Sequence, residues 1–302
     1  MTEAPNYGVA DNSNKPVWHW GKEKDKLERA LLPRTMSHAP LVMPADHYAP
    51  IAGIYDFSYE DFSEDVDFYE NLARSVDGPL LELGVGSGRA AIPLAESGYQ
   101  VVGIDTSASM LEQARRRLAA KKLKKGSVEL VEADMTAFDL GRKFAFVFVA
   151  ANTFQHLLTT RDQLACLKCA NAHLAPGGIF ALSVRSPATV SWEDVDVATP
   201  LLLDWTRTDP ETGDTVMKFV AAQADPARMV RRMTYVYDRV KADGSVRRSV
   251  FVTDLRHSTQ AELTLLLQQA GLRVTHVYGD YDLSPVGLGD NLILVARAEG
   301  SR

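Results

Sequence analysis

The sequence predicts an α/β fold, in which a doubly wound and mainly parallel sheet carries a small antiparallel β insertion. Three observations support this prediction. Residues 80–105 read as strand, glycine-rich turn, helix from about Arg89 to Ser97, and strand, which is the repeating unit of open parallel sheets. Buried apolar runs recur at residues 128–135 and 143–152, with helical stretches around them. Residues 187–256 instead hold three short alternating runs, at residues 214–223, 228–240 and 245–255, between turn signals, which is typical of antiparallel strands.

Composition narrows the functional classes. The chain has 302 residues, of which 46% are hydrophobic and 24% charged, as in an ordinary globular protein of one large or two modest domains. The net charge of −6 argues against nucleic acid and against an anionic membrane as partners. No apolar run approaches the roughly 18 residues that a membrane span needs. Cys166 and Cys169 lie within one helical stretch, and there is no second cysteine pair to complete a zinc site, so we expect buried thiols and no metal site. Two cysteines in one short segment also indicate a reducing compartment rather than a disulfide scaffold, so we expect a cytoplasmic location.

The unit at residues 80–105 predicts a site for a nucleoside-like cofactor. Gly84, Gly86 and Gly88 follow a buried strand, and glycines let the backbone turn tightly and approach a ligand closely. Asp105 ends the next strand, where a carboxylate can accept both ribose hydroxyl protons. A dinucleotide fingerprint would need glycine or alanine where this chain has Arg89, which argues against that class of cofactor.

The pattern E-x-G-x-G-x-G from Glu82 to Gly88 resembles motif I of the class I S-adenosylmethionine-dependent methyltransferases. The resemblance implies a Rossmann-like, doubly wound sheet of seven strands with an antiparallel last strand, and S-adenosyl-L-methionine as the cofactor. Residues 272–278 and 291–298 read as two final strands without a helix between them, which agrees with such a sheet. It also implies that the antiparallel insertion lies over the active site.

The resemblance assigns cofactor contacts residue by residue. Asp105 would hold the ribose, and Asp134 would accept a proton from the adenine amino group, although a loop acid that caps residues 136–138 is the alternative. Tyr55 lies in a Tyr-Asp segment that closes over the cofactor in many small-molecule methyltransferases; otherwise it is a packed aromatic. The full set of predicted contacts is Tyr55, Glu82, Gly84, Gly86, Gly88, Asp105, Thr106, Met110, Asp134, Met135 and Ala150.

The acceptor side is predicted from the segment after the fourth strand, Ala150 to Leu157. It is similar to the N-S/T-F-x-H-L motif of the glycine N-methyltransferase-like group, in which this loop lies beneath the transferred methyl. His156, Asn152 and Tyr55 are therefore candidate catalytic residues, with His156 as a proton acceptor or, alternatively, a structural histidine. The candidate substrate contacts are Asn152, Thr153, His156 and Arg256, the last of which could equally be a structural ion-pair partner. The segment lacks N/D-P-P-Y/F, which argues against adenine and glutamine as substrates.

The sequence divides into four regions. Residues 1–45 are expected to be an arm, partly disordered or serving as a lid. Residues 46–186 form the cofactor-binding core, residues 187–256 the antiparallel insertion as a substrate lid or dimer surface, and residues 257–302 the last part of the core. The expected partner is a small-molecule methyl acceptor, with a homodimer as a second expectation.

The expected reaction is methyl transfer to an amine nitrogen by in-line displacement. Two alternatives remain open at this point. The same donor site could serve an O- or C-methyltransferase of a secondary metabolite, or a non-catalytic S-adenosylmethionine-binding protein that regulates a partner.

Overall fold

The computed structural model describes residues 46–59, 62–193, 198–210 and 212–299. The predicted arm of residues 1–45 therefore lies outside the described residues. Within the described part of the chain, no helix combines the length and apolar character needed to cross a membrane.

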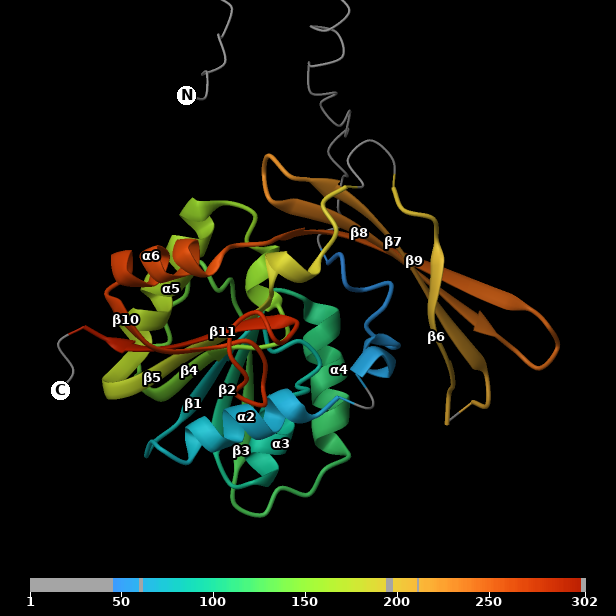
Figure 1. The fold of residues 1–302 in the computed structure, drawn as a ribbon. Coiled ribbons are helices and arrows are strands. Elements are labelled where there is room, and N and C mark those ends of the chain that lie inside the picture. Colours follow the sequence, from blue (N-terminus) through green and yellow to red (C-terminus); the bar gives the residue numbers. More distant parts are fainter. Residues whose placement is uncertain (1–45, 60–61, 194–197, 211, 300–302) are drawn as a thin grey trace, which may run out of the picture. The chain divides into compact units, whose positions relative to one another are not determined.

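The core is a seven-stranded sheet with the strand order β10-β11-β5-β4-β1-β2-β3 (Figure 1). Its strands are β1 (Leu80–Leu83), β2 (Gln100–Asp105), β3 (Ser127–Glu132), β4 (Phe144–Val149), β5 (Leu174–Arg185), β10 (Leu272–Tyr278) and β11 (Asn291–Ala298). The pairs among β1 to β5 are parallel, whereas β11 runs antiparallel to both β5 and β10. The predicted doubly wound sheet with an antiparallel last strand is thus confirmed.

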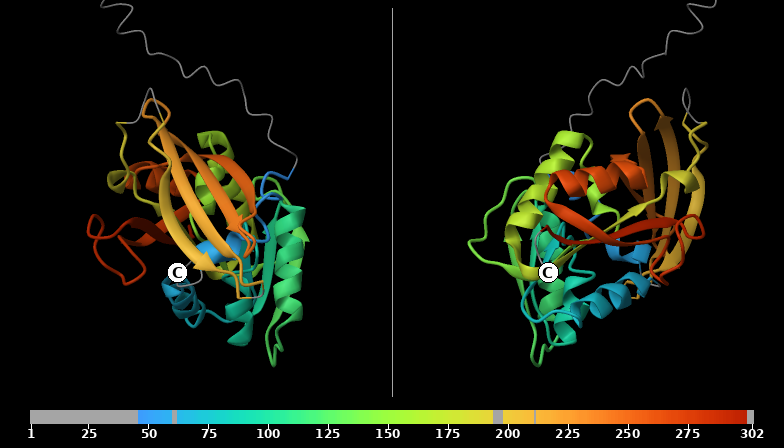
Figure 2. Two further views of the ribbon diagram at one scale, coloured as in Figure 1. Left: turned by 90° about the vertical axis from the view of Figure 1, so that its right-hand side faces the viewer. Right: turned by 60° about the vertical axis from the view of Figure 1, so that its left-hand side comes forward.

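Helices cover both faces of this sheet. The helices α5 (Thr160–His173) and α6 (Gln260–Gln269) pack on one face, and α2 (Glu64–Ala73), α3 (Ala91–Glu96) and α4 (Ala108–Ala119) on the other (Figures 1 and 2). Neighbouring residues of β4 show why both faces must be apolar: Phe146 packs toward α2 and α3, and Val147 toward α5 and α6. Side-chain oxygens of Ser107, Thr159 and Thr259 cap α4, α5 and α6.

The glycine turn extends further than the sequence predicted. Helix α3 begins at Ala91 rather than near Arg89, and Gly88, with a φ of 75°, still belongs to the turn. The side chain of Arg89, which precedes the helix, donates two hydrogen bonds to Asp65 on α2. The rings of Tyr59 and Phe62 lie 5.1 and 5.5 Å from the same guanidinium.

The predicted insertion is a separate antiparallel sheet with the order β6-β7-β8-β9 (Figure 2). Its strands are β6 (Leu202–Thr208), β7 (Thr215–Asp225), β8 (Val230–Val240) and β9 (Val246–Arg256). Three of these strands follow the predicted alternating runs. The fourth strand, β6, has no predicted counterpart. It is an edge strand whose side chains are mostly exposed, so its sequence does not alternate between apolar and polar residues.

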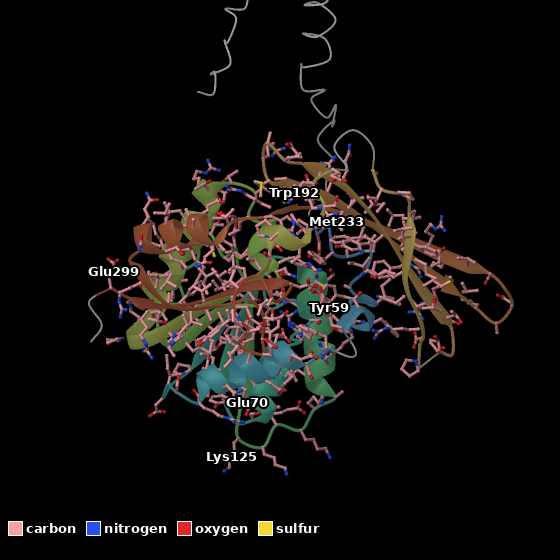
Figure 3. The ribbon with its side chains drawn as sticks, viewed as in Figure 1. Tyr59, Glu70, Lys125, Trp192, Met233 and Glu299 are labelled. Atoms are coloured by element: carbon pink, nitrogen blue, oxygen red, sulfur yellow. The ribbon has the colours of Figure 1, made fainter. Side chains whose placement is uncertain are left out.

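A short segment joins the second sheet to the core. Residues 46–54 and the 3₁₀ helix η1 (Tyr55–Tyr59) lie against the inner face of the antiparallel sheet, where Ile51 packs with Tyr237 and Phe251. Figure 3 shows Tyr59, at the end of η1, among the side chains that fill the space between the two sheets. We call residues 46–59 the bridging segment.

Candidate active site

The glycine turn after β1 is shaped by close contacts. Gly84 has a φ of 71°, and a Cβ atom there would lie only 2.2 Å from Cγ2 of Thr153. A side chain at this position would therefore push away the loop that follows β4. Glycine thus lets two segments of the core approach each other at the carboxyl ends of their strands.

Asp105, at the end of β2, is held by the same turn. One carboxylate oxygen accepts a hydrogen bond from the backbone N–H of Gly86, and the other accepts one from the backbone N–H of Ser107, both at 2.8 Å. Burial raises the pKa of Asp105, and the backbone bonds from Ser107 and Gly86 act in the opposite direction. The two bonds fix the orientation of a carboxylate that faces a cavity.

That cavity, which we call the glycine-loop cavity, has a volume of about 250 Å³. It contains eight of the predicted cofactor residues, namely Tyr55, Gly84, Gly86, Asp105, Thr106, Met110, Asp134 and Met135. Its other lining residues are His47, Tyr48, Ala133, Thr153, His156 and Leu157. Carboxylates and apolar side chains thus line one space, which suits a ligand with a hydroxylated sugar and a flat base.

Three predicted cofactor residues do not line this cavity. Gly88 packs against Ile92, and Ala150 is buried in the core. Glu82 is also buried, with one carboxylate oxygen that has no hydrogen-bond partner, and burial raises its pKa to about 8. The structure therefore places these three residues behind the cavity wall rather than on it.

Asp134 forms the cap that was the alternative interpretation of it, and it also lines the glycine-loop cavity. One of its oxygens accepts hydrogen bonds from the backbone N–H and the hydroxyl of Thr136, both at 2.8 Å, so it caps the following turn. The same residue lines the glycine-loop cavity beside Met135.

The loop after β4 has an unusual backbone. Ala151 and Asn152 have φ values of 51° and 64°, so two consecutive non-glycine residues adopt the left-handed conformation. Such residues cost on the order of 1 kcal/mol each and are concentrated at functional sites. The turn leads into the 3₁₀ helix η2 (Thr153–His156), and it leaves the side-chain oxygen of Asn152 buried without a hydrogen-bond partner among the described residues.

His156 lies where two cavities meet. Its Nε2 atom is 2.9 Å from the hydroxyl of Tyr48, and its Nδ1 atom is 3.3 Å from the hydroxyl of Thr253 on β9. Burial lowers the pKa of His156 to about 4, and the nearby His47 adds to this shift. The imidazole is therefore neutral at physiological pH, with one nitrogen as a donor and the other as an acceptor.

The second cavity, the tyrosine cavity, has a volume of about 180 Å³ and lies between the bridging segment, η2 and the antiparallel sheet. It is lined by Tyr48, Ile51, Tyr55, Ser58, Tyr59, Ala151, Asn152, Thr153, His156, Lys218, Tyr235, Tyr237, Phe251, Thr253 and Leu255. Four of these residues, Tyr48, Tyr55, Thr153 and His156, also line the glycine-loop cavity. The antiparallel sheet thus closes over a site whose other half belongs to the core.

The charge in the tyrosine cavity is low. Among the described residues that line it, Lys218 is the only one with an ordinarily charged side chain, and it pairs with Asp204 at 2.9 Å. Burial raises the pKa of Tyr48 and Tyr55 well above the usual value, so their hydroxyls keep their protons. The cavity therefore offers neutral hydroxyl, amide and imidazole groups.

The bridging segment is fastened at both ends. Asp46 accepts hydrogen bonds from the Ser109 backbone N–H at 2.8 Å and from the Ser107 hydroxyl at 2.7 Å. Asp56 accepts one from the Ser87 hydroxyl at 2.5 Å and pairs with Arg117 at 3.1 Å. Between these anchors the segment carries His47 and Tyr48, which our sequence analysis missed because no local pattern distinguishes them from other packed side chains.

Arg256 lies away from both cavities. Its guanidinium donates to the Thr160 hydroxyl at 2.9 Å and pairs with Glu262, so it joins the start of α5 to the start of α6. The structure thus does not bring Arg256 together with the other predicted substrate contacts.

The two cysteines are free thiols. Cys166 is fully buried, which raises the pKa of its thiol, and Cys169 contacts the backbone oxygen of Thr136 at 3.4 Å. Among the described residues, no group of three or more metal-ligating side chains is close enough to hold an ion.

Comparisons with known proteins agree with this geometry. The protein-family description "Methyltransferase domain" matches residues 80–178. A cypemycin N-terminal methyltransferase from Streptomyces sp is 30% identical over 216 residues, which cover 70% of this chain and 80% of that protein. A dTDP-3-amino-3,4,6-trideoxy-alpha-D-glucopyranose N,N-dimethyltransferase from Streptomyces venezuelae is 27% identical, covering 76% of this chain and 92% of that protein.

Solved structures with a similar fold are also methyltransferases. The CcbJ methyltransferase from Streptomyces caelestis has a TM-score of 0.66 and 28% identity, with coverage of 85% of this chain and all of the other. The structure of CalS10 with bound S-adenosylmethionine, an amino pentose methyltransferase from Micromonospora echinaspora, has a TM-score of 0.62 and 25% identity, with coverage of 81% and 97%.

Proposed function

The chain belongs to the class I S-adenosylmethionine-dependent methyltransferases, and we propose that its methyl acceptor is an amine nitrogen held in the tyrosine cavity. The observation that carries this proposal is the unpartnered, buried side-chain oxygen of Asn152 in the wall of a cavity of low charge. Such an oxygen needs an N–H or O–H donor, since a buried acceptor without one costs free energy. Relatives whose names specify N-terminal, amino-sugar and amino-pentose methylation support nitrogen over oxygen.

The residues of the glycine-loop cavity fit the cofactor. We assign the ribose hydroxyls to Asp105, the adenine amino group to Asp134, and the faces of the base to Met110 and Met135. When bound, S-adenosylmethionine supplies a methyl group on a positively charged sulfur, which is already an activated leaving group. The protein consequently needs to provide little beyond position and alignment.

The protonation state of the acceptor follows from the charges around it. An amine can attack only with a free lone pair, and the tyrosine cavity favours this neutral form because Lys218 is its one charged group among the described lining residues. With a pKa of about 4, His156 is a weak base. We therefore propose that His156 orients the amine through the Tyr48 hydroxyl, which lies 2.9 Å from its Nε2 atom, and that the proton leaves to solvent.

We also propose domain boundaries, a cellular location and an oligomeric state for this enzyme. Residues 46–186 and 257–302 would form the cofactor-binding core, and residues 187–256 the cover of the acceptor site. A cytoplasmic location and a homodimer are proposed with them. The exposed apolar side chains of Leu203 and Val250, which lie in one row on the outer face of the antiparallel sheet, are the surface we assign to a second copy, and sedimentation of a Leu203→Asp variant tests it.

The acceptor class can be tested directly. The purified protein is incubated with S-adenosylmethionine and a panel of amines, with alcohols and carbon acids of the same size as controls, and products are identified by mass spectrometry. Methylated amines are the expected products. Methylation of alcohols or carbon alone would overturn the amine assignment. Tight S-adenosylhomocysteine binding with no product from any acceptor would favour the non-catalytic alternative.

A further inference from the structure

The inner face of the antiparallel sheet continues beyond the tyrosine cavity. Strands β8 and β9 place Tyr235 opposite Phe251, Tyr237 opposite Ser249, and Arg239 opposite Arg247. Because side chains alternate along a strand, these three pairs lie in a row on one face. The row starts with aromatic residues in the tyrosine cavity and ends with two guanidinium groups.

The two arginines line a hollow of their own. It has a volume of about 260 Å³, and its walls are Ala49, Pro50, Gly53, Ile54, Val216, Tyr237, Arg239, Arg247 and Ser249. We call it the arginine hollow. Tyr237 lines both the arginine hollow and the tyrosine cavity, so the two spaces adjoin along the sheet.

The charges in the arginine hollow are unequal. Arg239 is neutralised by Asp209, with which it forms a short ion pair, and by Asp214 at 3.5 Å. The guanidinium of Arg247 has no ion-pair or hydrogen-bond partner among the described residues, although Arg247 lies directly opposite Arg239 in the sheet. Because two carboxylates already neutralise Arg239, Arg247 is the cation open to an added anion among the described residues that line the hollow. The next residue, Arg248, points to the other face and pairs with Asp238 at 2.6 Å.

The strand β9 sets the separation between the arginine hollow and His156. Thr253 touches His156, and Arg247 is six residues earlier on the same strand. At about 3.4 Å per residue this separation is roughly 20 Å along the strand. A molecule that reaches from His156 to the hollow must therefore be elongated.

We propose that the arginine hollow binds an oxyanion, a phosphate or a carboxylate, carried by an elongated methyl acceptor whose amine lies at His156. The inference rests on the proposed amine methylation and names the acceptor class more closely. Arg247 supplies a planar set of N–H donors that suits both oxyanions, and the hydroxyls of Ser249 and Tyr237 provide further donors beside it.

The test uses ω-amino alkyl phosphates and carboxylates of increasing chain length, with ω-amino alcohols of the same length as uncharged controls. We expect kcat/KM for methylation to favour the anions by about tenfold or more once the chain is long enough, since charge-assisted hydrogen bonds are worth this much. The Arg247→Gln variant should lose the preference through a higher KM, whereas Arg248→Gln should retain it. Equal use of anions and alcohols, or a preference that survives in Arg247→Gln, would overturn the inference. A preference for only one of the two oxyanions would identify the acceptor's group.

A binding measurement separates this inference from the proposed function. Calorimetry with the S-adenosylhomocysteine-loaded protein and the longest amino phosphate needs no turnover. If no amine is methylated but binding still depends on Arg247, the amine proposal fails and the anion site stands. If amines are methylated and binding does not depend on Arg247, the anion site alone fails. Circular dichroism of Arg247→Gln checks its fold, which an exposed residue is not expected to disturb.

Discussion

The two cavities that meet at His156 differ in how the chain builds their walls. The glycine-loop cavity is formed mainly by residues at the carboxyl ends of consecutive core strands, each beside its own strand in the sequence. The walls of the tyrosine cavity come from distant parts of the chain: Tyr48 contacts His156 across 108 positions, and His156 contacts Thr253 across 97. The first cavity is thus a local property of the sequence, and the second depends on register and packing. Substitutions should therefore separate cofactor binding from acceptor use.

The largest effect is expected at Asp105. In the Asp105→Ala variant, S-adenosylmethionine should bind at least about 100-fold more weakly. On the proposed assignment, the variant would lose two charge-assisted bonds to the ribose, each worth roughly 1.5–3 kcal/mol. Isothermal titration calorimetry measures this loss. Asp139→Ala, which removes an exposed carboxylate outside both cavities, is the matched control and should bind normally. Near-normal affinity of Asp105→Ala would remove the ribose role from this residue.

A smaller and more selective effect is expected at Asn152. Its Asn152→Gly variant removes the side-chain oxygen but retains a backbone that tolerates the left-handed conformation. We expect kcat to fall by about 10- to 100-fold, as for the loss of one buried hydrogen bond. The affinity for S-adenosylhomocysteine should stay within about twofold, because Asn152 lines only the tyrosine cavity.

A second variant, Asn152→Ala, distinguishes the effect of losing the side-chain oxygen from the effect of straining the backbone. It lacks the same oxygen but must also bear the left-handed conformation, so it should be less stable than Asn152→Gly and equally slow. If both variants turn over at the wild-type rate, the acceptor amine is held elsewhere.

The same contrast explains what could be predicted from the sequence. The glycines, Asp105 and the apolar strands sit at fixed spacings, so the parallel sheet could be predicted from the pattern, and eight of the residues that the family resemblance proposes for the cofactor line one cavity. Gly88 and Ala150 were assigned by the same resemblance, but a sequence motif does not reveal which of its residues face the cavity. Tyr48 and Thr253 become neighbours of His156 only through tertiary packing. Strand β6 lacked an alternating pattern because its apolar residues Leu202 and Leu203 lie on opposite faces and are both exposed.

The next effect concerns stability as a function of pH. Burial lowers the pKa of both His156 and His257 to about 4. The amide of Gln155 donates to Nδ1 of His257 at 3.0 Å, a bond that protonation would break. The unfolded chain takes up protons near pH 6.5 and the folded chain only near pH 4. The free energy of unfolding should therefore be greatest above pH 6.5 and decrease by on the order of 1–3 kcal/mol per histidine as the pH falls to 4.

Urea unfolding at several pH values measures this decrease. His257→Asn should make the slope between pH 6.5 and 4 shallower, whereas replacement of the exposed His276 by Gln should leave it unchanged. An unchanged slope in His257→Asn would show that this histidine does not resist protonation in the folded state.

The smallest effect is expected where the tyrosine cavity meets the arginine hollow. The Tyr237 hydroxyl is 3.4 Å from the Ser58 hydroxyl, a long contact, whereas the Tyr48 hydroxyl is 2.9 Å from His156. For an uncharged amine, Tyr237→Phe should therefore change kcat/KM by about twofold or less, and Tyr48→Phe by about fivefold to tenfold, since shorter and better-aligned hydrogen bonds contribute more. Steady-state kinetics of the two variants with one acceptor gives the ratio. A larger loss in Tyr237→Phe would place the reacting amine nearer the arginine hollow than His156, and would move the acceptor site outward along the sheet.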